Sequence, residues 1–460
     1  MIKKIKQRGS VLALVLVAGT FFLVVFTGLL GYVGGQRHVS VKKTQREQAF
    51  NIAEAGIEMY RWHVASQLNG RTAAQIADYW LGVPLGVPSY DREYRDPQGK
   101  AVGQFSLEVT PPQEGSTIIE VQSTGWHYDN PEVKRKIKAR LRKPAWSEYV
   151  VVANDIMRFG QGTEIWGPIH SNNGIRFDGI AHNVISSSKQ EYWDPDTGSM
   201  KDGVWTAMPD PSQVFLAGTD FPVAVTDFTG MIGNLAEMKA QAQIYLDPYS
   251  GLNKYGYHLI LKDDGTMDVY KVTSRGSSSH HINSESFYKN YPLPDSGVIF
   301  VEDDATIEGE ISDKKITIAC ADLETGSDYS NIYIEKDITY AGYDGSEMLG
   351  LIAQGDITVG LYSEDDLRID GALVAQNGRI GRDYYNFWTS WQYYKRDTIT
   401  IFGALATNQR YGFAWVCGGT VYCSGYEYRN IEFDPELMYN TPPYFPTQNE
   451  YQLDLWEEEK

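Results

Sequence analysis

The stretch that decides the fold reads Ser10-Val-Leu-Ala-Leu-Val-Leu-Val-Ala-Gly-Thr-Phe-Phe-Leu-Val-Val-Phe-Thr-Gly-Leu-Leu-Gly-Tyr-Val33. No residue from Val11 to Val33 carries a charge, and the run is long enough to cross a hydrocarbon core of about 30 Å as a helix. Helix-forming residues resume in Gln45-Arg-Glu-Gln-Ala-Phe-Asn-Ile-Ala-Glu-Ala-Gly-Ile-Glu-Met-Tyr60. We therefore expect a transmembrane helix that continues as an amphipathic helix, together over residues 10–68.

The amphipathic part of this helix carries one apolar stripe. Its members recur at intervals of three and four residues and are Ala49, Ile52, Ala53, Gly56, Ile57 and Tyr60. Such a stripe needs a partner surface that removes it from water. Alternating segments follow, and in Val133–Arg142 the apolar Ile137, Ala139 and Leu141 alternate with basic residues. This predicts an antiparallel sheet with its apolar face under the helix and its basic face in water.

The composition describes a globular, β-rich chain. Of 460 residues, 44 are glycine and 31 are tyrosine, which favours strands joined by tight turns. The net charge is −18, whereas nucleic-acid binding needs concentrated lysine and arginine. The basic face of Val133–Arg142 leaves an anionic polymer open as an alternative, but we expect no nucleic-acid partner.

The part of the chain after Pro144 contains a short internal repeat. Leu351-Ile-Ala-Gln-Gly-Asp-Ile357 and Leu373-Val-Ala-Gln-Asn-Gly-Arg-Ile380 share an apolar start, an Ala-Gln pair and a polar corner with glycine. Their offset of 22 residues (373 − 351) fits one coil of a parallel β-solenoid, in which apolar residues stack inward. The alternative is an antiparallel sandwich. We predict a mostly β fold: a long transmembrane helix, an α+β module in which the amphipathic helix packs on the antiparallel sheet, and a parallel β-solenoid body.

These patterns divide the chain into seven segments. They are a basic leader (1–9), the helix (10–68), an antiparallel sheet (69–144), the first part of the solenoid (145–188), an insertion with a helix and a hairpin (189–296), further solenoid rungs (297–425) and a C-terminal strap or cap (426–460).

The N-terminal segment resembles the class III signal of type IV pilin-like proteins. A basic leader ends in Gly9 and precedes the apolar helix, and the stretch Gln48–Glu58, with its Ala-Glu-Ala-Gly core, is similar to the N-terminal domain of PilX-type proteins. The resemblance covers roughly the first 65 residues. It implies cleavage between Gly9 and Ser10 by a prepilin peptidase, a cytoplasmic N-terminus and an extracytoplasmic body in a pilus or at the cell surface. The implied partners are the lipid bilayer, other pilin-like subunits and the pilus assembly machinery.

One position departs from the family pattern. Major pilins carry a glutamate five residues after the cleavage site, and this chain has Leu14 there. The resemblance therefore implies a minor pilin at a filament tip, or a priming component, rather than a shaft subunit. The alternative is a membrane-anchored surface protein that is never cleaved.

No motif for catalysis, metal binding or phosphate binding is present. The sequence lacks a Gly-x-Ser-x-Gly elbow, a His-Glu-x-x-His motif and a phosphate-binding loop. We expect a non-enzymatic protein without cofactor or metal, which presents its body for capping, adhesion or surface interaction. The alternative is a membrane-anchored carbohydrate-active enzyme on a β-helix scaffold.

Two further features of the body are candidate sites. Tyr384, Tyr385, Trp388 and Trp391 lie in a ring-dense polar segment that is typical of glycan-binding or protein-binding surfaces, with a buried loop cluster as the alternative. Cys417 and Cys423 flank a Gly-Gly turn, which makes a local disulfide possible outside the cytoplasm. The alternative is that both are small buried residues.

Overall fold

The computed structural model describes residues 10–68, 71, 73–81, 90–112, 117–228, 235–252, 254–324, 329–417, 421–438, 441–448 and 451–459. The basic leader, with Gly9, lies outside the described residues. The chain forms two compact units. Unit 1 comprises residues 1–111, 118–142 and 452–460, and unit 2 comprises residues 112–117 and 143–451.

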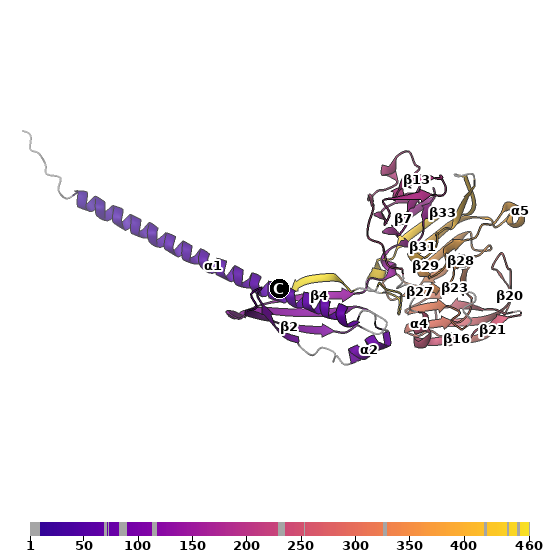
Figure 1. Ribbon diagram of the computed structural model, residues 1–460, viewed down its shortest axis with the longest axis horizontal. Coiled ribbons are helices and arrows are strands. Elements are labelled where there is room, and N and C mark those ends of the chain that lie inside the picture. Colours follow the sequence, from indigo (N-terminus) through magenta and orange to yellow (C-terminus); the bar gives the residue numbers. More distant parts are fainter. Residues whose placement is uncertain are drawn as a thin grey trace, which may run out of the picture. The chain divides into compact units, whose positions relative to one another are not determined.

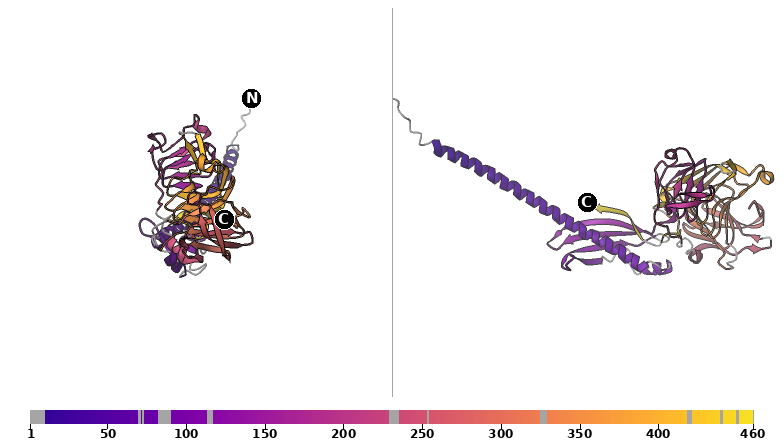
Figure 2. Two further views of the ribbon diagram at one scale, coloured as in Figure 1. Left: turned by 90° about the vertical axis from the view of Figure 1, so that its right-hand side faces the viewer. Right: turned by 45° about the horizontal axis from the view of Figure 1, so that its top comes forward.

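Unit 1 consists of a long helix on an antiparallel sheet (Figure 1). Its elements are α1 (Ser10–Leu68), α2 (Ala73–Leu81), β1 (Tyr90–Arg95), β2 (Ala101–Thr110), β3 (Ile119–His127), β4 (Asn130–Arg142) and β34 (Gln452–Glu459). The sheet order is β1-β2-β3-β4-β34, and all its pairs are antiparallel. The N-terminal part of α1 extends beyond this sheet, as Figure 2 also shows.

The C-terminal half of α1 packs tightly on the sheet. The stripe residues Ala49, Ile52, Ala53, Ile57 and Tyr60 are buried there. Glycines allow the close approach, because a Cβ on Gly125 of β3 would overlap the backbone of α1 and a Cβ on Gly56 would overlap side chains of β2 and β3. The helix and the sheet therefore meet through small residues.

Basic residues of β4 form ion pairs along the outer edge of this strand. The C-terminal strand β34 lies along it and brings acidic residues into register. Asp454 accepts hydrogen bonds from Arg140 at 2.8 and 2.9 Å and pairs with Arg142. Arg135 pairs with Glu458, and Lys136 with Glu459. The face that we expected in water is therefore partly exposed, and the basic residues next to β34 form an ion-pair seam with it.

Unit 2 is a body of short strands. Its first elements are η1 (Trp146–Glu148), β5 (Val151–Ala153), β6 (Met157–Phe159), β7 (Thr163–Trp166), β8 (Ile169–Ser171), β9 (Ile175–Phe177), β10 (Ile180–Ala181), β11 (Ile185–Ser187), β12 (Glu191–Asp194), β13 (Ser199–Asp202), β14 (Val204–Trp205), η2 (Pro211–Gln213) and β15 (Thr219–Asp220). They are followed by α4 (Leu235–Gln241), β16 (Ala242–Leu246), β17 (Ser250–Gly251), β18 (Lys254–Tyr255), β19 (Tyr257–Leu261), β20 (Thr266–Arg275) and β21 (Ile282–Pro292). The last group is β22 (Ser296–Val301), β23 (Ala305–Ile311), β24 (Lys315–Cys320), β25 (Ile332–Ile334), β26 (Ile338–Tyr340), β27 (Met348–Ala353), β28 (Ile357–Val359), β29 (Asp366–Ala375), β30 (Ile380–Arg382), α5 (Phe387–Ser390), β31 (Lys395–Thr407), β32 (Ala414–Cys417), β33 (Val421–Phe433) and η3 (Pro435–Met438).

Parallel pairing dominates unit 2. One ladder joins β16, β22, β24, β27, β29, β31, β5, β8 and β11, each parallel to the next. The register places equivalent apolar residues above one another in a single column. This column consists of Ile244, Ile299, Ile318, Leu351, Leu373, Leu405, Val151, Ile169 and Ile185. The protein is thus mostly β with a parallel sheet and a long N-terminal apolar helix, and the antiparallel sandwich considered for the body is wrong.

The order of strands in this ladder differs from their order along the chain. Strand β5 pairs with β31, so Val151 lies beside Leu405, 254 residues away (405 − 151). Residues 145–188, which we expected to start the stack, therefore follow its C-terminal strands. The chain then has to reach β16 at the opposite end of the ladder.

Two segments have roles in the structure that differ from the roles we expected from the sequence. The expected insertion, residues 189–296, contributes β16 to the end of the ladder, and its hairpin strand β19 pairs in parallel with β23. The expected strap, residues 426–460, contributes β33 to the parallel sheet and β34 to unit 1. The reason is apolar register, since Ile244 and Leu246 of β16, and Ile431 of β33, belong to the buried core.

The strands of the main ladder are buried on both faces. One face lines the central apolar core, and the other carries a second cluster with Phe300, Ile352 and Val374. Trp146, Phe228 and residues of α4 belong to that second cluster. Burial on both faces explains why these strands have nearly continuous apolar sequences.

Candidate functional site

The N-terminal half of α1 is an uncharged and exposed helix. Large apolar side chains point outward along it, and their exposed fractions are 66% for Val11, 70% for Phe22 and 59% for Val33. Among the described residues, it is the one helix long and apolar enough to cross a membrane. Ser10 is the first described residue of this helix. Exposure of such a surface is stable only where a second apolar medium covers it.

The ring-dense segment of unit 2 is divided between surface and interior. Trp388 and Trp391 are exposed, at 89% and 65%, and Tyr384 is about half exposed. Tyr385 is buried, and the Arg382 guanidinium lies 4.7 Å from the centre of its ring. The short helix α5 is capped by Asn386, whose side chain accepts a hydrogen bond from the Thr389 amide at 2.9 Å. Three of the four candidate aromatic residues are therefore accessible from solvent.

Cys417 and Cys423 are joined by a disulfide bond. They close the tip of the antiparallel pair formed by β32 and β33. The third cysteine, Cys320, is buried in β24. The bond therefore constrains a hairpin that adjoins a cavity of unit 2.

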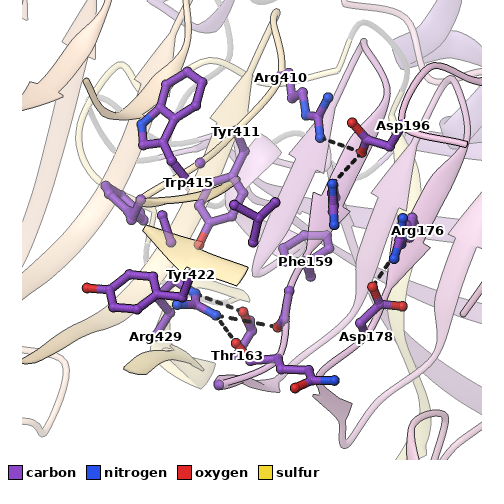
Figure 3. Close-up of a pocket in the computed structure, with 18 of the residues that line it drawn as sticks. Phe159, Thr163, Arg176, Asp178, Asp196, Arg410, Tyr411, Trp415, Tyr422 and Arg429 are labelled. Carbon is purple, nitrogen blue, oxygen red and sulfur yellow. Dashed lines mark hydrogen bonds and ion pairs between the residues drawn. The ribbon is translucent and has the colours of Figure 1, made fainter. Parts of the chain in front are cut away.

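This cavity has a volume of about 760 Å³ and lies wholly within unit 2 (Figure 3). Its walls come from β6, β7 and β9, from the segment that follows β31, and from β32 and β33. The lining contains five arginines (158, 176, 379, 410 and 429) and four acidic residues (155, 178, 196 and 427). Aromatic rings of Phe159, Tyr411, Phe413, Trp415, Tyr422 and Tyr428 complete it. We call it the Arg–aromatic pocket.

A shared carboxylate organises one wall of the Arg–aromatic pocket. Asp196 lies 2.9 Å from Nη1 of Arg158 and 3.1 Å from Nη2 of Arg410 (Figure 3). Partial burial raises the pKa of Asp196, but the two guanidinium groups outweigh it and hold that pKa below its ordinary value. Two cations therefore share one anion at this wall.

A buried guanidinium organises the opposite wall. Arg429 donates from Nε to Thr163 Oγ1 at 3.0 Å and from its two terminal nitrogens to backbone carbonyls, including Glu427 at 2.7 Å and Gln161. Burial lowers the pKa of Arg429, with carbonyl oxygens as its hydrogen-bond acceptors. Figure 3 shows this fan of hydrogen bonds, which fixes the loop before β7.

The pocket carboxylates are engaged in structural contacts. Asp178 accepts from Nε of Arg176 at 2.8 Å and from the Ala207 amide at 2.8 Å. Asp155 accepts from the Ile156 amide at 2.7 Å. Together with the double pairing of Asp196, this leaves no isolated pair of carboxylates among these three.

The sequence reasoning missed this pocket. Its residues come from three stretches, around 155–178, at 196–208 and at 379–429, and only the fold brings them together. The available signal was the run Gln409-Arg-Tyr-Gly-Phe-Ala-Trp415, which combines rings with an arginine. Within the described residues, no group of three or more His, Cys, Asp or Glu side chains is arranged to hold a metal ion.

No protein-family model matches the chain, and no curated protein matches it. The competence-associated pilin ComZ from Thermus thermophilus has a crystal structure similar to this chain, with 14% identity, a TM-score of 0.32, and coverage of 90% of this chain and 98% of that one. An ice binding protein from an Antarctic Biological Consortium is similar at 10% identity and a TM-score of 0.16, over 60% of this chain and 87% of that one. Neither similarity is strong enough to assign a function.

Proposed function

We propose that this protein is a non-enzymatic, pilin-like membrane component of the minor pilin type, with a β-solenoid body presented outside the cytoplasm. The observation that carries the proposal is the two-part character of α1. Its first half is exposed and uncharged from Val11 to Val33, and its second half is packed on an antiparallel sheet. A bilayer covers the first half, or neighbouring helices of the same kind do so in a filament.

The role of Leu14 follows from the medium around it. A carboxylate in hydrocarbon is costly unless it is paired, so a glutamate at this position serves to pair with a charge on a neighbour. Leu14 is apolar and 71% exposed, and it offers no such pairing. We assign the protein to the end of an assembly, or to its initiation, rather than to a repeating shaft.

The solenoid part of the proposal rests on the ladders of unit 2. Besides the main ladder, Ile338, Ile369, Ile401, Ile431 and Ile165 are aligned in a second parallel column. Ile332, Ile357 and Ile380 are aligned in a third. Stacked coils with inward columns bury apolar surface that no single coil can bury, and they form a stiff body for surface contacts.

The test of the membrane and processing part is the mature N-terminus. The chain is expressed in cells with an active prepilin peptidase and in cells without it, and the N-terminus of the membrane-bound protein is sequenced. Ser10 is expected in the first cells and the uncut leader in the second. Gly9→Val is expected to prevent cleavage, whereas the matched variant Gly19→Val is cleaved normally, because a Cβ at Gly19 meets nothing within 4 Å.

Two outcomes contradict parts of this proposal. An intact leader in cells with active peptidase removes the pilin-type processing and leaves a plain membrane anchor. A protein that remains soluble and does not float with lipid vesicles removes the membrane assignment as well.

A further inference from the structure

We infer that the exposed rings of Phe387, Trp388 and Trp391 are a contact site for a lipid bilayer other than the one that α1 spans. We call these three rings the aromatic tip. This contact is additional to the proposed function, on which it rests only for the location of unit 2 outside the cytoplasm. The tip belongs to α5 and the residue that follows it, at the periphery of unit 2 (Figure 1).

The aromatic tip is an exposed apolar surface. The exposed fractions of Phe387, Trp388 and Trp391 are 46%, 89% and 65%. The centre of the Phe387 ring lies 5.4 Å from that of Trp388 and 6.3 Å from that of Trp391, both edge to face, so the rings form one cluster. Since an aromatic side chain buries about 150–250 Å², the exposed parts of the three amount to on the order of 400 Å². A contiguous apolar patch of this size is typical of a contact site.

The tip lies in a charge-free segment. No residue from Tyr384 to Tyr394 carries a charge. Asp383, which precedes the segment, is already paired, at 3.0 Å from Arg379 and 3.0 Å from His280. Tryptophan and tyrosine are enriched at the boundary between lipid headgroups and acyl chains, whereas charged side chains are costly below it. The composition of the segment therefore fits this boundary.

The loop around the tip satisfies backbone groups internally. Asn386 Oδ1 accepts hydrogen bonds from the amide of Thr389 at 2.9 Å and from its hydroxyl at 3.0 Å. The Asn386 carbonyl accepts from the Ser390 amide at 3.1 Å, and the Ser390 carbonyl accepts from the amides of Tyr393 and Tyr394, both at 2.8 Å. Backbone groups that enter lipid need such partners, because little water is available there.

A saccharide fits the aromatic tip less well. Sites for small ligands combine ring faces with placed hydrogen-bonding groups that fix the orientation of the ligand. Among the polar side chains beside the rings, Asn386 and Thr389 are bonded to each other and Ser390 is buried, whereas Gln392 is exposed. Exposed rings with few directed polar groups favour a bilayer, which requires no directed partner.

The base of the loop is fixed to unit 2 at several points. Ser424 Oγ accepts from the Tyr385 amide at 3.1 Å and donates to the Tyr394 carbonyl at 3.1 Å, so it joins the two ends of the loop. Arg382 donates to the carbonyls of Tyr394 at 3.2 Å and Tyr393 at 2.7 Å. Rings presented on a fixed base lose less conformational entropy when they enter a lipid surface.

The chain connections of unit 1 favour a second bilayer. Strand β4 begins at Asn130, whose side chain donates to Gln45 of α1 at 3.0 Å. From there it follows α1 toward the C-terminal end of the helix (Figure 1), and its 13 residues span about 40 Å before it ends at Arg142, opposite Gln452. Both connections to unit 2 thus leave unit 1 far from the membrane-spanning half of α1. A tip on unit 2 is therefore matched with a lipid surface that faces the cell rather than with the membrane of α1.

The experiment offers lipid vesicles to the full chain held in nanodiscs by α1. Phosphatidylcholine nanodiscs that carry the protein are mixed with sucrose-loaded phosphatidylcholine vesicles, the vesicles are sedimented, and the protein in the pellet is measured. The wild type is expected to sediment with the vesicles, also in molar salt, because rings rather than charges make the contact. Trp388→Ala combined with Trp391→Ala is expected to lower the partition coefficient by about tenfold or more.

Matched variants separate the tip from other exposed rings. Trp193→Ala removes a ring that is 57% exposed on β12 of the same unit, and it is expected to sediment as the wild type does. Trp388→Phe combined with Trp391→Phe keeps the rings and is expected to retain most of the binding. Thermal unfolding of each variant verifies that unit 2 is folded.

Brominated lipid identifies the bilayer that the tip enters. Brominated phosphatidylcholine in the vesicles is expected to quench the tryptophan fluorescence of the wild type more than that of the double alanine variant. The same difference with brominated lipid in the disc, and without vesicles, would mean that the tip contacts the bilayer that α1 spans. That result would overturn the assignment to a second bilayer.

Other outcomes overturn the lipid contact itself. They are a wild type that stays in the supernatant, a double alanine variant that sediments equally, and loss of binding in molar salt or in Trp193→Ala. Retention on insoluble cellulose that depends on the tip, without binding to vesicles, would make the tip a glycan site instead. Pairing of discs that depends on the tip, without vesicles, would make a second copy of the chain its partner.

Insertion into the discs tests the proposed function separately. A chain that enters discs but does not bind vesicles loses only the lipid contact of the tip. A chain that stays soluble without discs loses the membrane assignment, and it is then mixed with the vesicles directly, with the same variants and the same expected differences.

Discussion

The two units of this chain stabilise strands in different ways. The sheet of unit 1 is antiparallel, buries one face under α1 and closes its edge with the ion-pair seam of β4 and β34. The main ladder of unit 2 is parallel and is buried on both faces by columns of isoleucine, leucine and valine. In unit 1 ion pairs link the outermost pair of strands, whereas in unit 2 apolar columns run through the whole main ladder. The two units should therefore respond differently to substitution, salt and pH.

The largest effect is expected from the apolar column of unit 2. Leu373→Ala removes a side chain that is 1% exposed and stacked between Leu351 and Leu405, and it should lower the free energy of unfolding by about 2–5 kcal/mol. Urea unfolding of the full chain measures this loss. The matched variant Leu216→Ala, at a position that is 53% exposed, should change it by less than about 0.5 kcal/mol. Equal losses in the two variants would mean that the column does not stabilise the unit.

The seam of unit 1 should give the next effect. Asp454→Asn leaves Arg140 and Arg142 without their shared carboxylate, at a site where all three side chains are at most 17% exposed. We expect a loss of about 2–3 kcal/mol, and faster proteolysis of the C-terminal strand. Glu457→Gln, in the same strand and exposed, serves as the control. Resistance of Asp454→Asn to protease at the wild-type level would show that backbone pairing alone holds β34.

A pH effect distinguishes unit 2. Burial raises the pKa of Asp303 to about 6, against an ordinary 3.8. Because the folded state then binds this proton more tightly than the unfolded state, the contribution of Asp303 to stability is greatest below about pH 4 and is lost as the pH rises through 6, a change of about 3 kcal/mol for this group.

The variant Asp303→Asn tests this pH effect. It should flatten the decline between pH 4 and 6, whatever constant stability it loses with the hydrogen bonds from Tyr249 and Asp304. The exposed control Asp263→Asn should retain the wild-type slope. Denaturation midpoints measured across this pH range decide between them, and an unchanged slope in Asp303→Asn would assign the decline to other groups.

The smallest effect is expected at an exposed ion pair between β3 and β4, next to the seam. Lys138 pairs with Glu120 at 3.4 Å, and the two side chains are 33% and 47% exposed. Solvent screens such a pair, so Lys138→Gln should cost less than about 1 kcal/mol, and high salt should reduce even that difference. A loss as large as that of Asp454→Asn would remove the distinction between the buried ion pairs of the seam and this exposed pair.

The sequence predicted the parts of the fold that depend on local pattern. Each of these patterns lies within about 25 residues: the charge-free run, the stripe from Ala49 to Tyr60, and the repeated segments at Leu351 and Leu373. The pairing of Val151 with Leu405 is not, because many apolar strands of similar length compete and only three-dimensional register chooses among them. The pairing of Asp454 with Arg140 and Arg142 of β4 could not be predicted for the same reason.

The pocket could not be predicted from local pattern either. Arg158, Asp196 and Arg410 become neighbours only after the ladder is assembled, and each alone reads as an ordinary surface charge. By contrast, the cysteines at 417 and 423 are close in sequence, so a link between them was open to prediction. The distance between residues along the sequence, rather than their type, therefore determines which of these contacts could be predicted.

The joint between β31 and β5 has a consequence for biosynthesis. A chain that emerges from a ribosome or a translocation channel presents β5 and β8 long before β31 exists, so the edge of β5 stays open until Thr407 has been delivered. The sheet of unit 1 is completed even later, because its fifth strand begins at Gln452. Assembly of both units is thus a late event, and a nascent chain needs protection from edge-to-edge aggregation until its last residues arrive.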